Sequence, residues 1–63
     1  MRKHIYSILV KRNDVRINYP VCRTNSDKYA DSKIKEKKTS LRKCLKPDCD
    51  FYLLIDGIFY KKL

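Results

Sequence analysis

FYLLIDGIFY, residues 51–60, carries the clearest structural signal in this chain. Two runs of β-branched and aromatic residues flank Asp56-Gly57, a dipeptide that favours a type I′ turn because glycine accepts a positive φ. A two-residue loop pairs Ile55 with Ile58 and Leu53 with Tyr60. Since side chains alternate between the faces of a strand, the predicted hairpin has one face made of Leu53, Ile55, Ile58 and Tyr60, and a second made of Tyr52, Leu54, Phe59 and the stem of Lys61.

Both faces of this hairpin are apolar. One face is expected to cover the metal-bearing layer of the fold, which carries the cysteines. The second meets the N-terminal hairpin or another molecule, and its anchors are then Tyr52, Leu54 and Phe59, since aromatic side chains dominate binding energy at protein interfaces. The same face also suits a core or a homodimer seam.

A second hairpin is expected at the N-terminus. Residues 4–11 read HIYSILVK, and after Asn13-Asp14 the next five residues alternate between apolar and polar types. This pattern predicts strands at 4–11 and 15–19. The tetrapeptide Tyr19-Pro20-Val21-Cys22 that follows is read as a turn, because proline fixes its own φ.

Residues 23–43 are polar and rich in lysine. A helix over 27–38, capped by Ser26 with Asp27 in its first turn, would place Tyr29, Ala30 and Ile34 on one side. Such a thin stripe gives a helix little to bury. Two short polar strands joined by a basic turn near 31–38, or a mobile loop, are therefore preferred.

Two thiols, Cys44 and Cys49, lie on either side of Lys46-Pro47-Asp48. A bend at Pro47 brings both sulfurs to one point, as in a metal-binding knuckle. Nearby cations favour the thiolate form that binds zinc. The alternative is that Cys44 and Cys49 are unrelated cysteines that bind no metal.

The segment from Tyr19-Pro20-Val21-Cys22 to Arg42-Lys43-Cys44-Leu45-Lys46-Pro47-Asp48-Cys49-Asp50-Phe51 resembles a zinc ribbon. It is most similar to the Ogr/Delta-type zinc fingers of phage late-gene activators, and more loosely to the zinc ribbon of bacterial ribonucleotide-reductase repressors. The resemblance covers residues 19–55. It implies short antiparallel strands, a structural zinc, and binding to nucleic acid or to the transcription machinery, in a protein encoded by a virus.

Tyr19 stands where that pattern has its first cysteine, so Cys22, Cys44 and Cys49 are one ligand short of a closed Zn²⁺ site. His4 is the natural fourth ligand, and Asp48, Asp50 or water are alternatives, as is a ribbon without metal. A three-residue loop in the N-terminal hairpin puts His4 on the same face as Cys22. A two-residue loop puts it on the opposite face, because a slip of one residue reverses facing.

The basic residues gather between the two cysteine segments. Residues 33–46 contain seven Lys and Arg and one acidic residue, Glu36. Phosphate contacts by such side chains give affinity that weakens with salt. The candidate nucleic-acid-binding residues are Arg23, Lys33, Lys35, Lys37, Lys38, Arg42, Lys43 and Lys46. In this set Arg23, Arg42 and Lys43 are held near the knuckles. The alternative is a solvated loop that keeps the protein soluble.

A length of 63 residues indicates one small domain. The strand patterns indicate that it is β-rich, with an N-terminal hairpin at 1–18 and a zinc-ribbon-like part at 19–63. The net charge of +9 favours polyanions or an acidic protein surface. An odd cysteine count indicates a reducing, cytoplasmic setting, and no stretch is long and apolar enough for a membrane span. No catalytic constellation is present in the sequence. The expected function is nucleic-acid binding in transcription regulation; the alternative is docking on RNA polymerase, the ribosome or a host enzyme.

Overall fold

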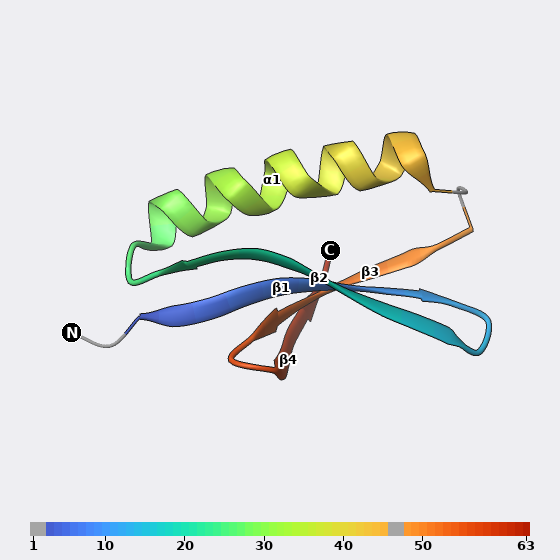
Figure 1. The fold of residues 1–63 in the computed structure, drawn as a ribbon, viewed down its shortest axis with the longest axis horizontal. Helices are drawn as coiled ribbons and strands as arrows, with labels where there is room; N and C mark the ends of the chain where they lie inside the picture. The colour runs from blue at the N-terminus through green and yellow to red at the C-terminus, as the bar shows by residue number, and fades with distance from the viewer. Residues whose placement is uncertain (1–2, 46–47) are drawn as a thin grey trace.

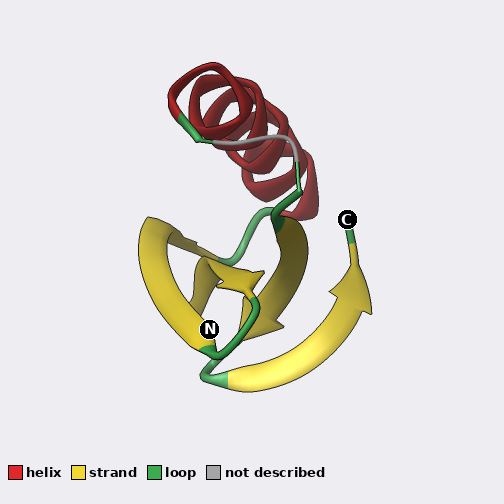
Figure 2. Cartoon of the chain, turned by 90° about the vertical axis from the view of Figure 1, so that its right-hand side faces the viewer, coloured by secondary structure: helices red, strands yellow, loops and turns green. Residues whose placement is uncertain are grey.

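The structure is a computed structural model, and it describes residues 3–45 and 48–63. Five elements follow one another: β1 (His4–Arg12), β2 (Val15–Thr24), α1 (Asp27–Cys44), β3 (Asp50–Ile55) and β4 (Ile58–Lys62). The strands form one antiparallel sheet in the order β2-β1-β3-β4, and α1 lies across one side of it (Figures 1 and 2). The predicted small β-rich fold with a hairpin at each end is therefore confirmed.

The β3–β4 hairpin forms around the predicted turn. Asp56 has φ 56° and Gly57 has φ 80°, as a type I′ turn requires, and Ile55 pairs with Ile58. Beyond Leu54 the register shifts, so that Leu53 pairs with Lys61 and not with Tyr60. The predicted pairing of Leu53 with Tyr60, and the predicted place of Lys61 on the face of Tyr52, were therefore wrong. This bulge moves Lys61 to the face that carries Leu53.

The β1–β2 hairpin closes with a two-residue loop, since Arg12 pairs with Val15. The predicted turn at 19–22 is wrong, because β2 runs on through Pro20 to Thr24. Proline has no N–H to donate, but β2 is an edge strand of the sheet, where a missing donor is tolerated. The register shifts directly after Pro20, which pairs with Ser7, whereas Cys22 pairs with Tyr6.

Residues 27–44 form a helix, so the preferred prediction of polar strands or a loop was wrong, and the alternative helix capped by Ser26 was right. The Ser26 hydroxyl accepts a hydrogen bond from the Tyr29 N–H at 3.3 Å. The helix runs past residue 38 and thereby adds Leu41 to its buried stripe. This longer stripe gives α1 the apolar contact area that a helix ending at 38 would lack.

The core lies between α1 and one face of the sheet. Ile8, in the central strand β1, is fully buried. The buried apolar side chains are Tyr6, Ile8, Val10, Ala30, Ile34, Leu41, Phe51 and Leu53. Since β1 contributes only even-numbered positions to this set, its odd-numbered side chains face the side of the sheet away from α1. Ser7 is one of them, and it is buried although it lies on that side. Among the described residues, no helix combines the length and the apolar character needed to cross a bilayer.

Candidate nucleic-acid interface

The candidate zinc ligands lie at different places in the fold. Cys44 ends α1 and Cys49 precedes β3, and both line an apolar groove at the C-terminal end of the helix. Cys22 lies on β2 and packs against the core. His4 lines a cavity under the N-terminal half of α1. An 18-residue helix is about 27 Å long, so His4 and Cys44 stand near opposite ends of that span.

The strand register determines on which face of the sheet His4 lies. The hairpin loop has two residues, yet the register shift after Pro20 brings Tyr6 opposite Cys22, the pairing that a three-residue loop would have produced. His4 therefore shares a face with Cys22. Its Nδ1 lies 2.7 Å from Oδ2 of Asp56 in the β3–β4 turn, and the other Asp56 oxygen accepts the Ile5 N–H.

Within residues 3–45 and 48–63, no three His, Cys, Asp or Glu side chains form a group that could hold a metal ion. A closed zinc site needs four ligands at one point. The arrangement of Cys22, Cys44, Cys49 and His4 does not fit that requirement.

The three thiols should differ in reactivity. Burial raises the pKa of the Cys22 thiol, and Lys33 only partly opposes this effect, so less of it is thiolate at a given pH. Cys44 is exposed. During limited alkylation with iodoacetamide near neutral pH, we expect peptide mass spectrometry to find Cys44 modified well before Cys22. In denaturant the difference should disappear. Equal rates in the native protein would contradict the partial burial of Cys22.

Most of the predicted basic residues lie on α1, which carries seven Lys and Arg, against Asp27, Asp31 and Glu36. Some of these cations contact rings of the fold. Arg42 Cζ lies 4.8 Å from the centroid of the Phe51 ring, and Lys37 Nζ lies 5.9 Å from the centroid of the Tyr19 ring. Such cation–π contacts attach the flanks of the helix to the sheet.

Lys33 is also engaged within the helix. It lies 3.7 Å from Glu36 and 5.6 Å from the ring of Tyr29, which is exposed. Lys38 is partly buried. The remaining cations, Lys28, Lys35 and Lys43, are exposed along one side of the helix, and we call them the outer row.

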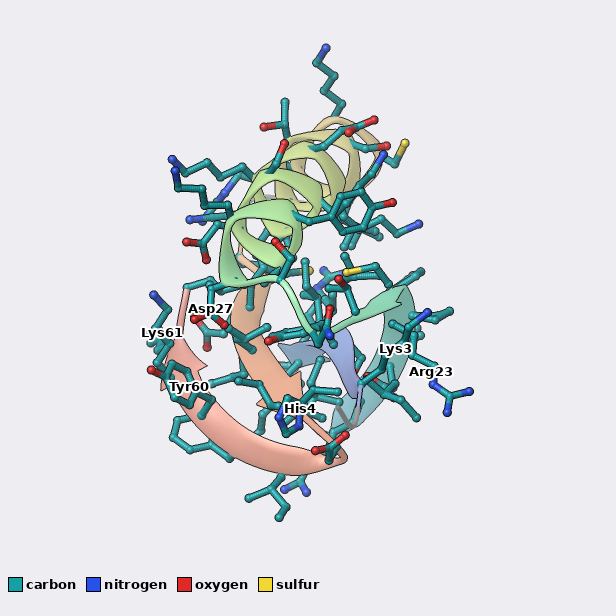
Figure 3. The ribbon with its side chains drawn as sticks, turned by 90° about the vertical axis from the view of Figure 1, so that its left-hand side faces the viewer. Lys3, His4, Arg23, Asp27, Tyr60 and Lys61 are labelled. Carbon is teal, nitrogen blue, oxygen red and sulfur yellow. The ribbon has the colours of Figure 1, made fainter. Side chains whose placement is uncertain are left out.

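Arg23 stands apart from this helix. It lies on β2 opposite Ile5, on the face of the sheet away from α1. Figure 3 shows Arg23 and Lys3 on one flank of the sheet, whereas Tyr60 and Lys61 lie on the other. The structure thus divides the predicted basic set between two surfaces, and Lys46 lies outside the described residues.

The face of the sheet away from α1 is called the open face here. It carries Tyr52, Leu54 and Phe59, which the sequence placed together, and Ile5 and Leu9 from β1. The sequence reasoning missed its cations other than Arg23, which are Lys11, Arg16 and Lys62. The alternation along 15–19 was the available signal, because it places Arg16 opposite to the buried side of its strand.

No family model, curated protein or solved structure matches this chain.

Proposed function

We propose that this protein binds nucleic acid and that the outer row of α1 contacts the phosphate backbone. The net charge of +9 supports this proposal, because polyanions attract such a chain without any specific contact. The proposal concerns backbone binding, which gives affinity and orientation but little sequence preference.

The outer row is the observation that carries the proposal. Lys28, Lys35 and Lys43 are exposed, and none of them makes an ion pair or a ring contact with another described residue. At a rise of 1.5 Å per residue, successive members are about 10 to 12 Å apart along the helix. A rigid helix therefore presents three ammonium groups in a line to a polyanion.

The salt dependence of binding tests this proposal. Fluorescence anisotropy at several salt concentrations should show that the logarithm of the association constant falls linearly with the logarithm of salt concentration. Replacing Lys28, Lys35 and Lys43 together by Gln should weaken binding and reduce the steepness of this dependence by about 2 to 3, since each lost phosphate contact removes about 0.7 to 0.9.

The matched control replaces the same three lysines by Arg, which keeps the charge and should keep the slope. Two results would overturn the proposal. The first is the absence of binding to RNA and DNA at low salt. The second is a slope that the Gln substitutions leave unchanged, which would remove the outer row from the interface.

A further inference from the structure

The open face combines exposed aromatic and aliphatic side chains with cations. Phe59 is 59% exposed and Ile5 is 52% exposed, although both lie in the sheet. The rings of Phe59 and Tyr52, on neighbouring strands, are 5.8 Å apart between centroids and tilted by 56°. Figure 2 shows α1 on one side of the sheet only, and no other described element covers the opposite side.

The strand register shows how this face is organised. The central rows hold Leu9 beside Tyr52, and Leu54 beside Phe59. Lys11 and Arg16 pair with each other at one end, and Arg23 lies at the other end opposite Ile5. Ile5 and Lys11, which mark these two ends on β1, are six positions apart, about 20 Å at the rise of a β-strand. Cations thus stand at both ends of an apolar centre.

The charge of the open face is mostly positive. Four cations, Lys11, Arg16, Arg23 and Lys62, share it with one strand carboxylate, Asp50, whose Oδ1 lies 3.7 Å from the Lys62 ammonium. An apolar patch alone would suit a protein partner or a second copy of the chain. The surrounding cations instead complement an occupant that has flat apolar parts joined by regularly spaced anions.

We infer that the open face binds single-stranded nucleic acid, with bases stacked on Phe59 and Tyr52 and the phosphates near the cations at both ends. Proteins that bind single strands without sequence preference combine stacking rings with a cationic track, and one such surface covers several nucleotides. A duplex cannot use the rings, because its bases are already stacked on one another. This inference goes beyond the proposed function, because it adds a second surface for nucleic acid on the side of the sheet away from the outer row.

The test measures the affinities of a short mixed-sequence single strand, as RNA and as DNA, and of the corresponding DNA duplex, by anisotropy. Phe59→Ala should weaken binding of the single strands by about 5- to 150-fold, the range found when one stacking ring is removed. Binding of the duplex to the outer row should change less than twofold. Phe59→Tyr keeps a ring and should restore the affinity. The RNA and DNA strands identify which sugar the face prefers.

Tyr60→Ala is the matched control. It removes an equally exposed ring from the next position of β4, but Tyr60 lines the cavity on the side of α1. It should leave single-strand affinity unchanged. If Phe59→Ala proves unstable, Phe59→Leu keeps apolar contact with Tyr52 while removing the ring, and the same loss is expected.

The outcomes separate the two proposals. If the wild-type protein binds nucleic acid but Phe59→Ala leaves its affinity for single strands unchanged, the inference is overturned and the proposed function stands. Absence of any binding at low salt overturns both. A dimer in sedimentation that Phe59→Lys dissociates would assign the open face to a second copy of the chain, and would also overturn the inference.

Discussion

Ile8→Ala should leave most of the protein unfolded at physiological temperature. Ile8 is fully buried in the central strand between β2 and β3, where it contributes to the single core. Removing three carbons there costs about 2 to 5 kcal/mol, the lost transfer free energy together with the cavity. A core in a domain of this size rarely supplies more than about 3 to 5 kcal/mol. Thermal denaturation followed by circular dichroism measures the loss.

Ile58→Ala is the matched control, since it makes the same chemical change at a side chain that is 71% exposed. It should cost less than about 1 kcal/mol, as surface substitutions usually do. Equal losses of stability in the two variants would show that the core is not centred on β1.

Ile34→Asp should detach α1 from the sheet. Ile34 is buried in the middle of the helix and contacts the core formed by β1 and β3. An ionised carboxylate at this buried position loses its hydration, which costs several kcal/mol or forces the group to protonate. We expect loss of the cooperative thermal transition and a large decrease in helical circular dichroism, because most of the stability of a protein helix comes from the packing of its apolar face.

Ser32→Asp provides the comparison for this prediction. Ser32 is exposed on the same helix two residues earlier, so the new residue has the same charge and the same helix propensity. The variant should melt within about 0.5 kcal/mol of the wild-type protein. If both variants lost helix content equally, the cause would be helix propensity and not the burial of Ile34.

Only part of the candidate interface could be predicted from the sequence. The density of Lys and Arg in residues 33–46 identified a cationic segment, whatever its secondary structure. Without the helix, however, Lys37 and Arg42 could not be distinguished from the outer row, because their contacts with the rings of Tyr19 and Phe51 come from other elements. Arg23 was grouped with the helix lysines, whereas its strand places it on the open face.

The zinc prediction relied on the spacing of the cysteines, on the bend expected at Pro47 and on the resemblance to a zinc ribbon. Spacing predicts that Cys44 and Cys49 lie close along the chain, and both do line one groove. It says nothing about where β2 and β1 place Cys22 and His4. The helix separates the ends of the molecule, and the single histidine contacts Asp56 instead.

The sequence by itself determined the local structure wherever a few neighbouring residues were sufficient. Asp56-Gly57 determined the C-terminal turn, because its backbone favours positive φ, and alternation predicted which side chains of β3 share a face. Only the tertiary structure decided that residues 27–44 are a helix, since the thin stripe of Ala30, Ile34 and Leu41 is stabilised by burial against the sheet, chiefly at β2 and β1. It also decided the register of β2, because whether an edge strand passes through Pro20 depends on the neighbouring strand β1 that pairs with it.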